Sequence, residues 1–356
     1  MSQRLALPPA LLPMQLGGHY LPGLLLTAAI TLLAVRLGEI PAVTRLGLSA
    51  LTMAILAGIL AGNSLYPPLR RHCDEGVQFA KQRLLRLGII LYGFRLTFQQ
   101  IDAVGATGII IDLVMLCSTF LLACWLGRKV FKLDTDTAML IGAGSSICGA
   151  AAVLATEPVL RAGADKVAVA VATVVIFGTA AIFIYPAFYQ LNLHYHWLPF
   201  TPQTFGIFTG STMHEVAQVV AAGHAIGPAA ENAAVIGKMI RVMMLAPFLL
   251  LLSAWVRRGR GQAAPARPIA LPWFALLFIL VAAFNSLHLL PPRLIAGINS
   301  LDTWLLAMAM AALGLTTHIG GLRRAGIRPL LLALLLFVWL MAGGALVNLG
   351  IQRLFG

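Results

Sequence analysis

The chain has 356 residues, of which 60% are hydrophobic and only 10% are charged, and its mean hydropathy is +0.90. Because soluble domains carry about 25% charged residues, this composition excludes a soluble globular protein and indicates an integral membrane protein. The formal net charge of +13 arises from short basic clusters between apolar runs. That pattern is typical of a multi-spanning protein and not of one that binds nucleic acid.

The first twenty residues hold one arginine, Arg4, and three prolines, without a small-residue cleavage site. They predict a short cytoplasmic tail and not a cleaved signal peptide. The four cysteines have neither metal-ligand nor disulfide-framework spacing. No metal and no other cofactor is therefore expected from Cys73, Cys117, Cys124 and Cys148.

Eleven apolar runs of about 17 to 25 residues predict membrane-spanning helices. The expected fold is an all-α polytopic membrane protein, with residues 1–356 forming a single transmembrane transporter domain. The fifth and seventh runs contain Gly, hydroxyl and ionisable residues, which predicts broken or re-entrant helices there. The runs lie near residues 22–38, 46–65, 84–100, 105–127, 136–158, 165–189, 203–224, 228–256, 270–289, 299–319 and 329–352.

The distribution of Lys and Arg predicts the orientation. With the N-terminus in the cytoplasm, sixteen of these residues lie on the cytoplasmic side and seven on the outer side. Because a Lys/Arg excess marks the cytoplasmic side, we expect a cytoplasmic N-terminus and a periplasmic C-terminus. Arg161, Asp165 and Lys166 are expected in an outer loop.

A shift of sixty-six residues aligns Gly144-Ser145-Ser146 with Gly210-Ser211-Thr212. A second, fainter similarity pairs residues 91–97 with residues 312–318 at a different offset, so the repeat unit stays open. Repeated halves with discontinuous helices near the midplane are typical of secondary transporters.

The two Gly-Ser runs are candidate parts of a solute pathway. An interrupted helix exposes free N–H groups at the start of its second half, and these groups with the local dipole favour an anion. The hydroxyls of Ser145, Ser146, Ser211 and Thr212 add donors for a substrate. The alternative is close helix packing through small residues.

Lys238 and Arg241 fall within an apolar span, three residues apart and hence on one helix face. Cations at membrane depth are costly and usually face the bundle interior or a cavity. Snorkelling to the interface is the alternative, but about fifteen apolar residues follow Arg241 before the next basic cluster. Two such cations suit an oxyanion as substrate.

His214 and Glu215 form a carboxylate–imidazole pair that indicates a proton relay at membrane depth. Glu215 as a structural ion-pair partner of Lys238 or Arg241 is an equally open interpretation. Gln218 lies one turn beyond His214 and is a candidate lining residue, as is Asn232. Asp112, like Asn63, Arg95 and His318, either faces the pathway or makes a buried hydrogen bond, and for each of them alone the buried hydrogen bond is favoured.

The segment His214 to Gln218 approaches the zinc-binding pattern H-E-x-x-H, but Gln218 replaces the second histidine. A zinc peptidase is therefore not expected. The chain also has no G-x-S-x-G nucleophile elbow and no Walker motif. The sequence does not predict an enzyme.

Three segments together carry a family resemblance: GAGSSICGAAAV at 142–153, GSTMHEVAQVVAAG at 210–223 and GKMIRVMMLAP at 237–247. They resemble the YeiH family of bacterial inner-membrane proteins, which are described as sulfate exporters, over the chain from about Leu48 onwards. That family is similar to the sodium/proton antiporter and bile-acid symporter group. The resemblance implies inverted repeats, crossed broken helices and elevator-type movement. The matching positions are Ser145, Ser146, Ser211, Thr212, His214, Glu215, Lys238 and Arg241.

The sequence thus predicts a proton-coupled secondary transporter that exports a small anion, sulfate-like or sulfonate-like, across the bacterial inner membrane. A sodium-coupled transporter of an organic anion and an anion channel are the alternatives. The expected partners are the small anion, membrane lipid and a second copy in a homodimer, with no nucleic acid.

Overall fold

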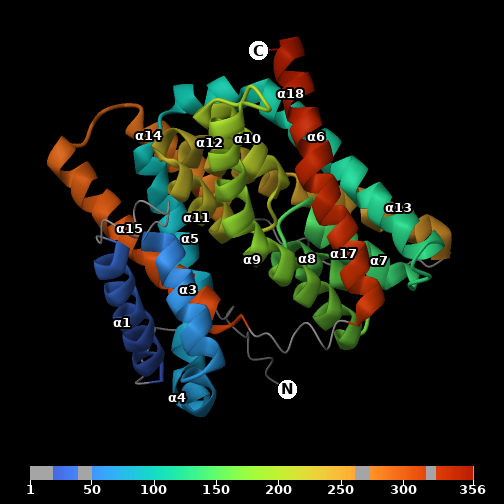
Figure 1. The fold of residues 1–356 in the computed structure, drawn as a ribbon, viewed down its shortest axis with the longest axis horizontal. Helices are drawn as coiled ribbons and strands as arrows, with labels where there is room; N and C mark the ends of the chain where they lie inside the picture. Colours follow the sequence, from blue (N-terminus) through green and yellow to red (C-terminus); the bar gives the residue numbers. More distant parts are fainter. Residues whose placement is uncertain (1–18, 39–49, 261–272, 318–325, 356) are drawn as a thin grey trace, which may run out of the picture.

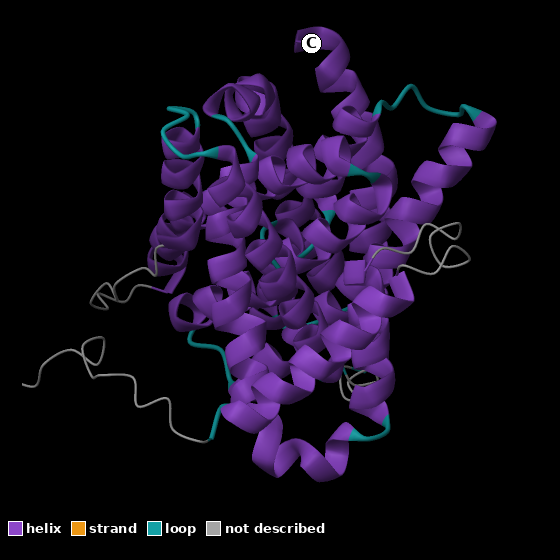
Figure 2. Cartoon of the chain, turned by 90° about the vertical axis from the view of Figure 1, so that its left-hand side faces the viewer, coloured by secondary structure: helices purple, strands orange, loops and turns teal. Residues whose placement is uncertain are grey.

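The computed structural model describes residues 19–38, 50–260, 273–317 and 326–355, and every regular element in these ranges is helical (Figures 1 and 2). The expected all-α polytopic fold is confirmed. The N-terminal tail, apart from its last two residues, and part of the fainter repeat at 312–318 lie outside the described residues.

The helices form two groups, with few contacts between one group and the other. A peripheral group lies at the left of Figure 1. It consists of α1 (Leu21–Gly38), α3 (Ala50–Asn63), α4 (Tyr66–Phe79), a π-helical turn (Ala80–Leu84), α5 (Leu85–Tyr92), a 3₁₀ turn (Gly93–Arg95), α14 (Trp273–Asn285) and α15 (Pro292–Leu315).

A central group fills the rest of the molecule (Figure 1). It consists of α6 (Phe98–Lys129), α7 (Thr135–Ser146), α8 (Ala150–Leu160), α9 (Ala164–Tyr195), α10 (Pro202–Thr212), α11 (Val216–Ile226), α12 (Pro228–Met243), α13 (Leu245–Arg260), α17 (Ile327–Val338), a π-helical turn (Trp339–Gly343) and α18 (Gly344–Phe355).

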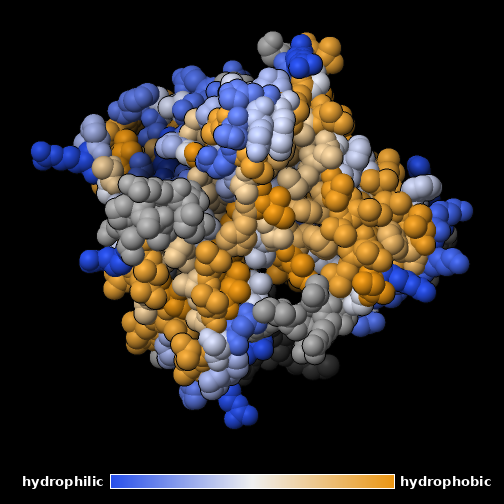
Figure 3. All heavy atoms as spheres, in the orientation of Figure 1, coloured by the Kyte–Doolittle hydropathy of each residue, from blue (hydrophilic) through white to orange (hydrophobic). Residues whose placement is uncertain are grey.

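Helix length and lipid-facing side chains both fit a membrane. Within the described ranges, six helical segments are long and apolar enough to cross a bilayer, and four shorter apolar helices accompany them. Large apolar side chains point outward on both groups, among them Leu60 and Leu251, each 73% exposed. Figure 3 shows broad hydrophobic fields on this face, with hydrophilic residues gathered at the top, at the right-hand edge and at the bottom.

The α7–α8 segment is a re-entrant hairpin. Asp134 caps α7 by accepting a hydrogen bond from the backbone N–H of Thr137. Lys166, six residues after the end of α8, lies 2.7 Å from the same carboxylate and 3.3 Å from Asp136. Both ends of the segment therefore lie at one end of the molecule, which we call the Asp134 end.

The prediction that Arg161 and Lys166 lie on the opposite side of the membrane from Arg128 and Lys129 is wrong as a consequence. Arg161 and Lys166 lie at the Asp134 end, because α7–α8 turns back instead of crossing. Hydropathy alone makes this segment a crossing, which puts both cations on the other side. With the two residues moved, the Lys/Arg count changes from sixteen against seven to eighteen against five, which strengthens the bias behind the predicted orientation.

The α10–α11 segment is a second hairpin that enters from the opposite end. The 32 residues of α9 span about 48 Å and lead from the Asp134 end to the start of α10. At that start, Gly206 lies against Ala230, near the beginning of α12. Gly223, near the end of α11, lies against the neighbouring Glu231. Both ends of the hairpin thus lie beside the start of α12.

The two hairpins belong to an inverted repeat with the sixty-six-residue offset. Helices α6 and α9 are related by this offset at both ends, and so are α8 and α11, while α7 and α10 match within one residue. The repeat unit is therefore one long helix followed by one hairpin. Because the two units enter from opposite ends, the expected inverted repeats are found. Both interrupted segments take the re-entrant form, and the crossed broken helices that the resemblance implies are not found among the described residues.

Candidate functional site

The tips of the two hairpins meet at Lys238, in the middle of α12. Its ammonium Nζ donates hydrogen bonds of 2.6 Å to the carbonyl oxygens of Ile147 and Met213. These residues directly follow the last residues of α7 and α10, and they are equivalent in the repeat. A single cation thus ties together the corresponding points of two opposed hairpins.

Arg241 makes the same kind of contact one turn further along α12. Its Nε donates to the carbonyl oxygen of Ser146 at 2.6 Å, and its Nη1 donates to that of Ser211. Both cations are fully buried. The last carbonyls of a helix have no partner within it and carry partial negative charge, so Lys238 and Arg241 satisfy and neutralise the ends of α7 and α10.

Glu215 has the opposite charge and lies at the N-terminal ends of α8 and α11. Glu215 is the N-cap residue of α11, and its backbone N–H donates a hydrogen bond of 3.0 Å to the side-chain oxygen of Gln218. The Oε1 atom of Glu215 accepts from the backbone N–H of Ala150, the first residue of α8, at 3.3 Å. The carboxylate therefore lies at two positive helix ends. Glu215 is partly exposed, unlike the two cations.

Gly149 provides the space for this carboxylate. Its φ of +66° is a backbone conformation that L side chains rarely adopt, and a Cβ there would overlap the Glu215 side chain. Gly149 is also the repeat counterpart of Glu215. The tip is thus asymmetric, because one hairpin supplies the carboxylate and the other supplies the room for it.

Asp112 of α6 is a member of the site that the sequence interpretation missed. It is 1% exposed and lies close enough to Lys238 and Arg241 for electrostatic interaction. Neither of its carboxylate oxygens has a hydrogen-bond partner among the described residues, so a structural hydrogen bond does not explain it. The available signal was an acidic residue inside an apolar span, which by itself indicates function.

Several other buried polar groups around the tips also lack a partner. Within the described ranges, no hydrogen bond reaches one nitrogen of Arg241, the hydroxyl of Ser145, Nδ1 of His214 or the side-chain nitrogen of Gln218. Buried polar atoms are satisfied in the great majority of cases. Four donor-capable groups and one carboxylate without partners therefore make the hairpin tips a candidate site for a polar ligand.

The remaining sequence-selected residues divide between the tips and elsewhere. The Ser211 hydroxyl bonds to the backbone of its own helix and to Asn348 of α18, and the Thr212 hydroxyl accepts from Tyr185 of α9. The Ser146 hydroxyl donates back to its own helix. These hydroxyls are engaged in packing. Asn232 is not at the tips but accepts from Tyr92 of α5, between the two helix groups.

Comparison with known proteins adds a family. Residues 22–333 match the family model described as "Conserved hypothetical protein 698". The chain is 64% identical to the inner membrane protein YeiH of Escherichia coli K12 over 335 residues, which cover 94% of this chain and 95% of that protein. It is 68% identical over 340 residues, 94% of each chain, to a membrane protein of Yersinia pestis.

The chain belongs to the YeiH family. The resemblance inferred from the three segments is thereby confirmed, and it extends further toward the N-terminus than Leu48. A membrane protein of Photorhabdus laumondii is also 62% identical over 345 residues, or 96% of each chain. These relatives carry names that state a membrane location and no activity, so family membership identifies a membrane protein and leaves its cargo open.

Proposed function

We propose that the protein is a secondary transporter that moves a small anion, sulfate-like or sulfonate-like, across the bacterial inner membrane. The observation that carries the proposal is the set of unpartnered buried groups where the two opposed hairpins meet. Hairpins that enter from opposite sides and meet near the midplane are typical of alternating-access transporters, whose substrate sites lie at the repeat interface.

A small oxyanion fits the donors that lack partners. The free nitrogen of Arg241, the Ser145 hydroxyl and the side-chain nitrogen of Gln218 are all donors, and the imidazole of His214 can act as one. Guanidinium groups bind oxyanions through strong charge-assisted bonds. In this proposal Lys238 holds the hairpin tips and contributes charge, while Arg241 both holds them and contacts the anion.

The charge balance supports coupling to protons. Lys238 and Arg241 carry two positive charges, which Glu215 and Asp112 balance when both are ionised. Protonating one carboxylate leaves one net positive charge, which attracts an anion into a site of low dielectric. Anion and proton then bind cooperatively, and linkage requires that each raises the affinity for the other. The partly exposed Glu215, with His214 beside it, is the proposed proton-binding group.

The same geometry argues against sodium as the coupling ion. Sodium sites in related architectures use backbone carbonyls of unwound helices. At both tips here, those carbonyls already accept hydrogen bonds from Lys238 and Arg241. A sodium ion would have to displace a buried ammonium or guanidinium.

For a doubly charged oxyanion, coupling to one proton predicts transport of the anion out of the cell. One proton bound with such an anion leaves one net negative charge on the transported unit. An inside-negative membrane potential drives that charge outward by about 2.3 kcal/mol per 100 mV. In an elevator-type movement the central group slides along the peripheral group, and the sparse contacts between the two groups support this mechanism.

Thermal stabilisation by anions tests the proposal, because a ligand that binds only the folded state raises apparent stability. We expect sulfate, sulfite, thiosulfate or taurine to stabilise the wild type. The Ser145→Ala variant should bind roughly tenfold to a hundredfold more weakly, as expected for one lost bond to a charged group. Lys238→Ala and Arg241→Ala should abolish binding.

The matched control is Thr173→Ala, which removes a buried hydroxyl that bonds only within its own helix. It should leave anion affinity unchanged and also shows whether loss of a hydroxyl alone alters folding. Equal stabilisation of wild type and Ser145→Ala, or stabilisation by no anion in the panel, would contradict the proposed site.

A further inference from the structure

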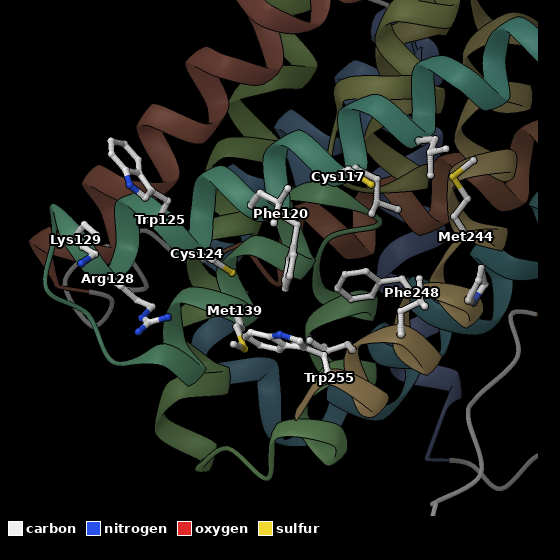
Figure 4. A pocket seen from close by; sticks show the side chains of 16 residues that line it. Cys117, Phe120, Cys124, Trp125, Arg128, Lys129, Met139, Met244, Phe248 and Trp255 are labelled. Carbon is white, nitrogen blue, oxygen red and sulfur yellow. The ribbon is translucent and has the colours of Figure 1, made fainter. Parts of the chain in front are cut away.

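A cavity of about 620 Å³ opens on the lipid-facing side of the central group, between α6 and α13 (Figure 4). Its volume lies in the range of about 300 to 1,000 Å³ that is usual for ligand sites. Its floor is buried and apolar, with the rings of Phe120 and Phe248 in edge-to-face contact at 4.9 Å. Its rims are exposed apolar side chains, including Leu121 and Leu251.

The cavity is charged at one end only. Figure 4 shows Arg128 and Lys129 at this end, while Met244 lies at the other. Both cations are exposed, and neither has a carboxylate within salt-bridge distance in the part of the chain that the structure describes. They lie in the last turn of α6, six and five residues before Asp134, the N-cap of α7.

The aromatic residues at this end of the cavity are typical of a membrane–water interface. Trp125 and Trp255 line the cavity from α6 and α13, each more than half exposed, and tryptophan is enriched where hydrocarbon meets headgroups. The positive-inside bias puts the Asp134 end on the cytoplasmic side. The repeat counterparts of Arg128 and Lys129 are His194 and Tyr195, so the opposite end of the molecule lacks the basic pair.

We infer that this cavity binds one anionic phospholipid of the cytoplasmic leaflet. The phosphate lies between Arg128 and Lys129, and an acyl chain lies along the apolar floor toward Met244. Along α6 the lining runs from Leu113 to Lys129, about 24 Å, which exceeds the roughly 15 Å of hydrocarbon in one leaflet. Basic pockets between helices on the cytoplasmic side recognise such headgroups.

The site is separate from the hairpin tips but touches the moving parts of the proposed mechanism. Its lining includes Met139 of α7 and Met244, the residue between α12 and α13. A lipid seated there would contact the hairpin that enters from the Asp134 end. Because the cavity is separate from the hairpin tips, lipid binding to it can be measured without any transported anion.

Native mass spectrometry of the full-length protein tests the inference, with phosphatidylglycerol and phosphatidylcholine of identical acyl chains as probes. We expect the protein to retain bound phosphatidylglycerol and to be thermally stabilised by it. The double variant Arg128→Gln/Lys129→Gln should weaken this binding by about thirtyfold, since each cation near an anionic headgroup contributes about one kilocalorie per mole. The control Arg83→Gln removes an exposed cation that does not line the cavity and should change nothing.

A second variant tests the apolar part. Cys117 is exposed and lines the middle of the cavity, so Cys117→Trp should displace the acyl chain while both cations remain. Equal binding of the two lipids, or unchanged binding in both variants, would overturn the inference. Equal stabilisation by inorganic phosphate would also overturn it. The same holds for a homodimer that dissociates in the Cys117→Trp variant while the lipid stays bound.

Discussion

At Gly149, both the backbone conformation and the packing of the hairpin tips require a glycine. Its positive φ excludes most side chains, and Glu215 fills the space in front of it. Gly149→Ala should therefore lower the free energy of unfolding by about 1 to 3 kcal/mol, the usual cost of such backbone strain. It should also move Glu215 away from the first residue of α8 and weaken anion binding.

Gly350→Ala is the matched control for this prediction, because a Cβ there meets open space within α18. Alanine is the better helix former by about 0.5 to 1 kcal/mol, so this variant should be unchanged or slightly more stable. Thermal unfolding in detergent compares the two. A similar loss of stability in both variants would show that the Gly149 backbone is not strained.

At the scale of elements, the α7–α8 hairpin is fixed at its base by Asp134. Burial alone would raise the pKa of this carboxyl, but hydrogen bonds from Lys166 and Thr137 outweigh it and lower the pKa below its ordinary value. Folding therefore favours the ionised form. The stabilisation is present above the pKa of an unfolded aspartate, about 3.9, and is lost as pH falls through the lower folded value.

Thermal unfolding as a function of pH measures this contribution. The wild type should lose about 0.5 to 1 kcal/mol between pH 5 and the acid limit from this group, a size that fits an ion pair whose carboxylate is half exposed. Asp134→Asn should lack that part of the acid loss. An identical pH profile in wild type and variant would contradict the role of Asp134 at the hairpin base.

At the scale of the whole molecule, the inverted repeat requires that α7–α8 returns to the side from which it came. Single cysteines at the exposed positions Val130, Asp165 and Trp197, in a chain without its own cysteines, test this with a membrane-impermeant thiol reagent. The first two should react from the cytoplasmic side and the third from the periplasmic side. Reaction of positions 130 and 165 from opposite sides would show that α7–α8 crosses the membrane.

Much of this architecture was predictable from the sequence, because apolar runs and polar interruptions report local structure directly. The two breaks, Lys238, Arg241 and Glu215 were all selected in this way. The direction of each hairpin was not predictable, since hydropathy does not distinguish a helix pair that crosses from one that turns back. The partners of Lys238 were also hidden, because backbone carbonyls carry no sequence signal. Asp112 did carry a signal, as an acidic residue inside an apolar span, but its place beside the two cations was not predictable.

Proton movement driven by a sulfate gradient in proteoliposomes is the measurement that tests the central claim most directly. With sulfate inside, the wild type should release sulfate and alkalinise the interior, faster when the interior is electrically negative. Thr173→Ala should behave like the wild type, whereas Glu215→Gln should lose the proton movement. Sulfate release by the wild type without proton movement would contradict coupling at the hairpin tips, and no release of any tested anion would contradict anion transport itself.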